Sequence, residues 1–95
     1  MTSSIENILS QLENADNKSK NALENKLVAI GNEAIPELVE KLSSVKGTVR
    51  GVVAMTLIRI GNASIKYLKK AAAGNKDFQW VADYLIREIS GTAVA

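Results

Sequence analysis

Residues 27–38 read LVAIGNEAIPEL and residues 57–68 read LIRIGNASIKYL, so one pattern returns after 30 positions. Each copy has a run of apolar residues, then Gly-Asn, then apolar residues three apart. The same period reaches the start of the chain, where Ile5 precedes Ile35 by 30 positions. A fixed repeat of this kind is typical of a solenoid, in which each unit buries its apolar face by stacking on a copy of itself.

Within each unit the apolar residues are three and four positions apart, which is the period of an α-helix. The predicted helices span residues 4–13, 17–30, 33–43, 48–60, 63–73 and 77–90. Their short connections favour antiparallel hairpins. We therefore expect an all-α fold, a short α-solenoid of about three stacked antiparallel helical hairpins. It forms a single domain over residues 1–90, followed by a small-residue tail, 91–95, that should fray. The predicted core includes Ile35, Leu38, Leu57, Ile60, Ile65, Leu68, Val81 and Leu85.

Glycine and proline mark the ends of several predicted helices. Gly31 and Gly61 each follow an apolar helical stretch, where a residue that tolerates positive φ ends a helix. Pro36 falls in a first turn, where its missing N–H costs little. Gly51 lies inside a predicted helix, where glycine costs about 1 kcal/mol relative to alanine, so we expect a close helix crossing there. Ser3 is a predicted N-cap that forms a capping box with Glu6. The other predicted N-caps are Asp16, Thr48, and either Asn75 or Asp77.

The last helix departs from the 30-residue period. Residues 85–87 repeat the Leu-Ile-Arg of residues 57–59, a shift of 28. This alignment predicts a shorter final turn and places Trp80 at the position of Val52.

Composition argues against an enzyme. The chain has 95 residues and no Cys or His, which removes most transition-metal sites and every mechanism that uses a cysteine or histidine. The best carboxylate pair, Glu37 and Glu40, lies three residues apart on an exposed helix face with no third group to orient it. We therefore predict no catalytic residues, no metal site and no cofactor.

Charge and targeting signals point to a cytoplasmic protein. The N-terminus lacks the pattern of a secretory signal, and the longest nearly apolar run, 52–58, is too short to cross a bilayer. The absence of Cys favours a reducing compartment. The net charge is +2, with basic and acidic residues interleaved, so neither a membrane nor a nucleic acid is the expected partner.

The second repeat carries a resemblance to a known family. Val49-Arg50, Val53-Ala54, Leu57 and Ile60-Gly61 resemble the HEAT-like repeat of the phycobilisome-lyase-type HEAT repeat family. The resemblance implies a scaffold or protein–protein interaction module, or, as an alternative, an accessory subunit in phycobiliprotein chromophore attachment or removal or in phycobilisome turnover. Gly47 stands where that family often has an acidic residue, so a continuous acid–arginine ladder between repeats is not expected.

One candidate binding surface is an exposed stripe on the helices 4–13, 33–43 and 63–73, which the resemblance places on the concave side. By count the three helices carry charges of −2, −2 and +3. Such a gradient favours a protein partner with its own charge asymmetry, although an ordinary solvated face is the simpler alternative. The candidate residues are Glu37, Glu40, Lys66, Tyr67 and Lys70.

A second candidate surface is the last helix. Trp80 and Tyr84 lie four residues apart and either cap the core at the end of the array or bind a partner. Because no dedicated polar cap is evident there, weak self-association through these aromatics is also expected. The inward face of this helix is predicted to be Phe78, Val81, Ala82, Leu85 and Ile89 in either case.

Overall fold

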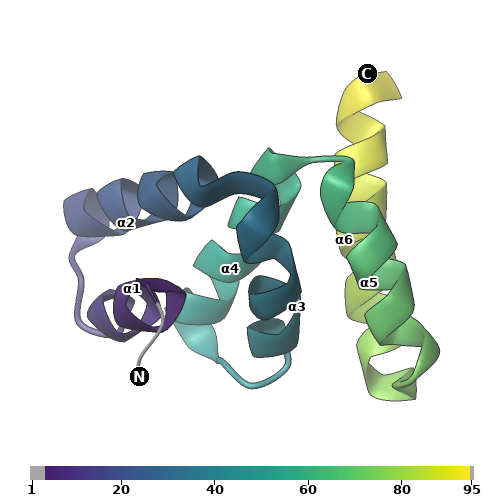
Figure 1. Cartoon of the computed structure of the whole chain (residues 1–95), viewed down its shortest axis with the longest axis horizontal. Coiled ribbons are helices and arrows are strands. Elements are labelled where there is room, and N and C mark those ends of the chain that lie inside the picture. The colour runs from purple at the N-terminus through teal and green to yellow at the C-terminus, as the bar shows by residue number, and fades with distance from the viewer. Residues whose placement is uncertain (1–3, 95) are drawn as a thin grey trace.

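A computed structural model describes residues 4–94 of the chain, with side chains described for residues 4–91. Throughout this part the structure is helical and contains no strand, which confirms the all-α class (Figure 1). The elements are α1 (Ser4–Leu12), α2 (Asn17–Ile30), the short 3-10 helix η1 (Gly31–Ala34), α3 (Ile35–Leu42), α4 (Gly47–Ile60), α5 (Ala63–Ala73) and α6 (Lys76–Val94).

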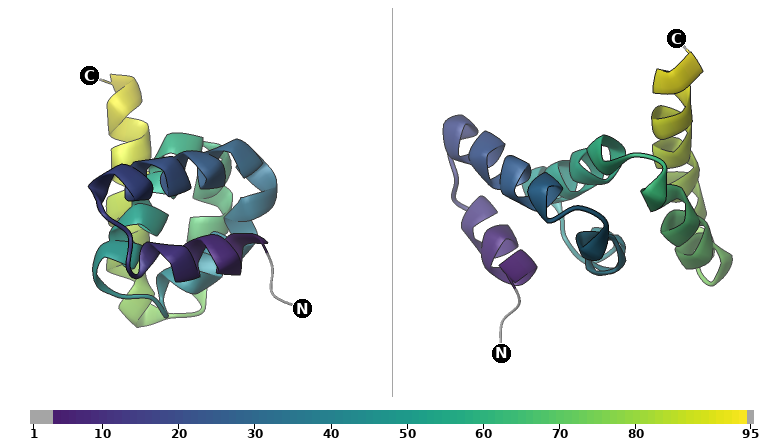
Figure 2. Two further views of the ribbon diagram at one scale, coloured as in Figure 1. Left: turned by 90° about the vertical axis from the view of Figure 1, so that its left-hand side faces the viewer. Right: turned by 45° about the horizontal axis from the view of Figure 1, so that its top comes forward.

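Helices that follow one another in the chain pack as pairs, α1 with α2, α3 with α4 and α5 with α6. Contacts also join α2 to α4, α4 to α6 and α3 to α5, so each pair packs against its neighbour. In Figure 1, α3 lies in front of α4 and α5 in front of α6, and the two views in Figure 2 show the same pairs from other sides.

Side-chain caps begin two of the helices as predicted. The Ser19 N–H donates to Asp16 Oδ1 at 2.8 Å at the start of α2. The Asp77 N–H donates to Asn75 Oδ1 at 3.0 Å at the start of α6. The prediction for Thr48 is wrong, because α4 begins one residue earlier, at Gly47, after Lys46, which makes no side-chain cap. The predicted cap Ser3 lies outside the described residues.

Gly31 and Gly61 end their helices as predicted, with φ of +76° and +91°. At the second of these turns the Gly61 N–H and the Ser64 hydroxyl donate to the same carbonyl, that of Leu57, at 3.1 and 2.9 Å. Ser64 is fully buried, so this bond satisfies its hydroxyl inside the core. After the first turn the chain forms η1, and α3 therefore begins at Ile35 rather than at residue 33.

The predicted core is confirmed at most positions. Six of the predicted residues are buried, namely Ile35, Leu38, Leu57, Leu68, Val81 and Leu85. Ile60 and Ile65, which flank the turn at Gly61, are only half-buried and pack against the edge of the core. The inward face of α6 is buried at every predicted position, Phe78, Val81, Ala82, Leu85 and Ile89.

The local prediction for Gly51 is wrong. Gly51 is exposed, and a Cβ built on it would have no atom within 4 Å, so no close helix crossing requires glycine there. The helix α6 continues through Gly91 to Val94, and Ala95 lies outside the described residues, so the fraying of residues 91–95 stays a prediction.

The buried residues of α4 and α6 match one another at a different sequence shift from the one that residue identity suggests. When each residue of α4 is matched to the residue 29 positions later in α6, buried residues match buried residues. The matched pairs are Val49 with Phe78, Val52 with Val81, Val53 with Ala82, and Thr56 with Leu85. Under the predicted shift of 28, Trp80, which is 70% exposed, would match Val52, which is 8% exposed. One residue of shift rotates a helix by about 100° about its axis, so the correction moves Trp80 from the core side to the outer side.

The shift of 29 also shows which side of α6 is polar where α4 is half-buried. In α4 the residues Arg50, Ala54 and Ile58 are half-buried, and Arg50 lines a pocket with Phe78 at the start of α6. The matching residues of α6 are Gln79, Asp83 and Arg87, all polar and exposed. The side of α6 that matches the half-buried side of α4 is therefore polar and exposed.

Candidate functional site

The predicted stripe lies on α3 and α5, which contact each other. Glu40, Lys66 and Lys70 are exposed, Tyr67 is 37% exposed, and Glu37 is half-buried. Glu37 and Glu40 are three residues apart on α3, and Lys66 and Lys70 are four apart on α5, so each pair shares one side of its helix. We call these five residues the charged strip.

The acidic and basic parts of the charged strip belong to different helices. Within residues 4–91, Lys66 and Lys70 form no ion pair. The ammonium groups on α5 are therefore available to the carboxylates of another molecule. On the acidic side, Lys41 Nζ on α3 lies 3.6 Å from Glu6 Oε1 on α1, and both side chains remain substantially exposed. Such a surface pair contributes little to stability, about 0–1 kcal/mol.

An open groove adjoins the acidic end of the charged strip, and sequence reasoning missed it. Its volume is about 250 Å³, and it lies between α1, the end of α3 and the start of α4. A neighbouring groove of about 330 Å³ shares part of this lining, including Glu13, Val45 and Val49. Both grooves combine apolar floors with exposed charged groups, which suits the side chains of a peptide segment better than an enclosed small molecule. The first groove is lined by Glu6, Leu9, Ser10, Glu13, Lys41, Ser44, Val45 and Val49.

Trp80 and Tyr84 of α6 do not cap the core. Trp80 is 70% exposed and Tyr84 is 56% exposed. The core is closed instead by the opposite side of the helix, where Val81 and Leu85 are buried. The capping interpretation is therefore wrong, and both aromatic side chains present most of their surface to solvent.

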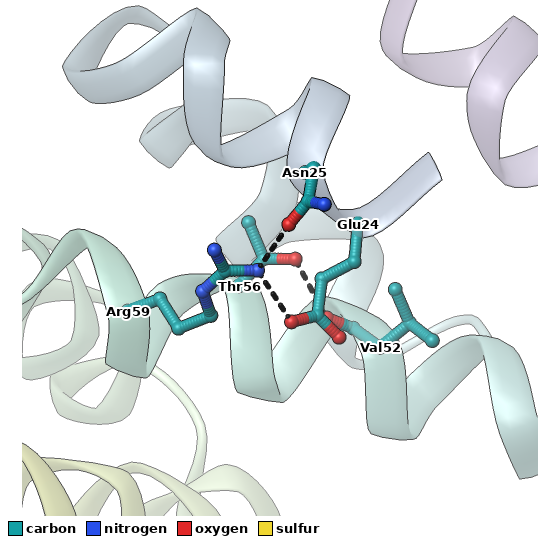
Figure 3. Close-up of polar contacts among 5 residues, drawn as sticks. All are labelled: Glu24, Asn25, Val52, Thr56 and Arg59. Atoms are coloured by element: carbon teal, nitrogen blue, oxygen red, sulfur yellow. Dashed lines mark hydrogen bonds and ion pairs between the residues drawn. The ribbon is translucent and has the colours of Figure 1, made fainter. Parts of the chain in front are cut away.

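A polar link between α2 and α4 was also missed (Figure 3). Arg59 Nη1 donates to Glu24 Oε2 at 2.8 Å and to Asn25 Oδ1 at 2.9 Å. Nearby, the buried Thr56 hydroxyl donates to the Val52 carbonyl at 2.7 Å and is satisfied within its own helix. This link joins neighbouring helical pairs and has a structural role. The only sequence signal for it is an acid and an arginine 35 positions apart.

Two structural features and one comparison bear on metal binding, membrane insertion and similarity to known proteins. No group of three or more Cys, His, Asp or Glu in the described part of the chain could hold a metal ion. Among the helices described, none has both the length and the apolar character needed to cross a membrane. Comparison of the chain with protein-family models, with curated proteins and with solved structures finds no match.

Proposed function

We propose that this chain is a non-catalytic protein-interaction module, a short α-solenoid of about three HEAT-like hairpins that binds a protein partner along the charged strip. Two facts support the solenoid. The sequence repeats at a period of 30, and α2, α4 and α6 pack in series while α3 packs on α5. Repeats of this type present extended surfaces to their ligands.

The observation that carries the proposal is the division of charge along the strip. Glu37 and Glu40 stand on α3, and Lys66 and Lys70 stand on the adjacent α5. A partner with a basic segment beside an acidic one binds such a surface in a single orientation, because the reverse orientation places like charges together. A uniformly charged polyanion, such as a nucleic acid, is repelled by the half of the strip on α3.

Tyr67 is the expected energetic centre of this contact. It lies on α5 among the lysines and is the one large aromatic side chain of the charged strip. Tyrosine is enriched among the residues that dominate binding energies, because its ring offers a large contact area and loses little conformational entropy. The charges around it select the partner, and the ring supplies most of the affinity.

The test is affinity capture from a lysate of the source organism, with the wild-type chain compared with folded variants. Glu40→Lys combined with Lys70→Glu keeps the net charge and should reduce capture of the partner at least about tenfold. Tyr67→Ala should reduce it further, whereas Lys26→Glu, an exposed charge change on α2, is the matched control and should leave capture unchanged. If the same protein is captured equally by the double reversal and by Tyr67→Ala, the charged strip is not the binding surface.

A further inference from the structure

Four large apolar side chains remain exposed within residues 4–91, and three of them lie on α4 and α6. They are Met55, Tyr67, Trp80 and Tyr84, with exposures of 48%, 37%, 70% and 56%. In the register set by burial, Met55 of α4 matches Tyr84 of α6, and Gly51 matches Trp80. These positions are exposed on each helix, and α4 and α6 contact each other. Tyr67 lies apart from them, on α5.

The exposed aromatic residues of α6 belong to a longer stripe. Asp77, Trp80, Tyr84 and Arg87 are separated by three, four and three residues, the spacing of a helix face that pairs with another helix. All four are exposed, and they span about 80° of the helix circumference on the side away from Leu85. We call these four residues the α6 stripe.

The α6 stripe is complementary to itself when reversed. Asp77 and Arg87 are each five positions from Ala82, and Trp80 and Tyr84 are each two positions from it. We propose that α6 binds α6 of a second copy of this chain in an antiparallel arrangement, with the two-fold axis at the level of Ala82. Each Trp80 then packs against the second copy's Tyr84, and each Asp77 pairs with the second copy's Arg87. This is the isologous contact that two-fold symmetry generates.

Charge favours this occupant and this orientation. Neither Asp77 nor Arg87 forms an ion pair within residues 4–91, so both are available to a second molecule. A parallel pairing of the same stripe would set Asp77 against Asp77 and Arg87 against Arg87, and like charges in contact are unfavourable. The reversed pairing removes both repulsions and creates two attractions.

The size of the stripe indicates a weak dimer. The exposed parts of Trp80 and Tyr84 amount to about 300 Å² per protomer, taking usual areas for these side chains. A standard stable interface buries about 800 Å² per partner, so the smaller area of the α6 stripe fits a weak dimer, to which flanking residues such as Met55 add further contact. The dimer does not rest on the proposed function, because the charged strip lies on α3 and α5 and stays open to its own partner.

Sedimentation velocity of the whole chain tests the inference over a range from about 10 µM to about 1 mM. The wild-type protein should move from monomer toward dimer across this range. The fluorescence of Trp80, the single tryptophan, should shift to shorter wavelength as the ring is buried. Trp80→Ala and Tyr84→Ala should remain monomeric, whereas Tyr67→Ala, which removes an exposed aromatic ring from α5, is the matched control and should dimerise normally.

Charge reversals test the register. Asp77→Arg and Arg87→Asp should each weaken dimerisation about tenfold, because each sets like charges together twice across the two-fold axis. The double variant, and an equimolar mixture of the two single variants, should recover the wild-type association. A wild-type chain that remains monomeric at the highest concentration overturns the proposal. So does a dimer that persists in Trp80→Ala, or a double variant that is no better than either single one. Circular dichroism confirms in each case that the variant is folded.

Discussion

Arg59 on α4 and Glu24 on α2 form a link between two neighbouring helical pairs, with Nη1 and Oε2 2.8 Å apart. The Glu24 side chain is 17% exposed and that of Arg59 is 41% exposed, so solvent weakens the attraction but does not remove it. The same nitrogen of Arg59 also donates to Asn25 at 2.9 Å. The link holds α2 against α4 through polar side chains of both helices.

Removing this link should destabilise the fold modestly. Arg59→Ala should lower the free energy of unfolding by about 1 kcal/mol, because the pair is charge-assisted yet partly exposed. A double-mutant cycle with Glu24→Ala should give a coupling of about 0.5–1 kcal/mol that shrinks as salt is added. The free energies come from urea denaturation followed by circular dichroism. Lys26→Ala, an exposed change on α2, is the control, and zero coupling would show that the pair contributes nothing to stability.

The sequence predicted the features that depend on local pattern. The helical period, the glycine turns at Gly31 and Gly61 and the cap at Asp16 each follow from a few neighbouring residues, and the structure confirms them. The link between Arg59 and Glu24 was not predicted, because it joins residues 35 positions apart whose distance depends on how α2 and α4 cross.

The register of α6 could not be read from identity alone. The Leu-Ile-Arg match indicated a shift of 28. A helix, however, packs with its apolar face against the core, and the apolar face of α6 consists of Phe78, Val81, Leu85 and Ile89. These residues support a shift of 29. The exposure of Trp80 and Tyr84 follows from that single residue of difference, and so does the α6 stripe. The charged strip stays a prediction from the sequence as a binding site, whereas the adjoining groove could be found only from the packing of α1 beside α4.

Gly51 offers a simple route to a more stable protein. It lies in the interior of α4 at an exposed site, and a methyl group there would meet no atom within 4 Å. Gly51→Ala should therefore raise the free energy of unfolding by about 0.5–1 kcal/mol, since alanine loses less backbone entropy on folding. Thermal denaturation measures the change. Gly61→Ala is the matched control and should destabilise, because its φ of +91° strains any residue with a Cβ. A destabilised Gly51→Ala would show that α4 does not accommodate a Cβ at this site.

Asp16 should make the stability of α2 depend on pH in the acid range. The Ser19 backbone N–H, followed by the Ser19 side chain, lowers the pKa of Asp16 below its ordinary value of 3.8. Because the folded pKa is lower than the unfolded one, the stabilisation is fully present above the unfolded value and is lost as pH falls through the folded one. Asp16→Asn keeps a good cap without a titrating group, so its melting temperature should fall less steeply below about pH 4. Equal slopes for both proteins would show that the Asp16 charge does not stabilise the fold.

The two possible registers of α6 predict opposite results for Trp80→Ala, and Leu85→Ala, which removes a core side chain in both registers, sets the scale for comparison. Leu85 is 2% exposed in the core and Trp80 is 70% exposed on the α6 stripe. Leu85→Ala should cost about 2–5 kcal/mol, because it leaves a cavity between α6 and its neighbours. That is a large part of the roughly 5–15 kcal/mol that holds a typical domain together. Trp80→Ala should change stability by less than about 0.5 kcal/mol when it is measured on dilute protein, where the monomer dominates.

Urea denaturation at low micromolar concentration separates the two cases. If a shift of 28 were correct, Trp80 would occupy the buried position of Val52, and its truncation would be among the most damaging changes in the chain. Ile86→Ala is a useful third variant, since Ile86 is half-buried and should fall between the other two in cost. A loss of several kcal/mol of unfolding free energy in Trp80→Ala would show that this side chain is buried in the core. It would also remove the exposed aromatic surface on which antiparallel pairing of α6 depends.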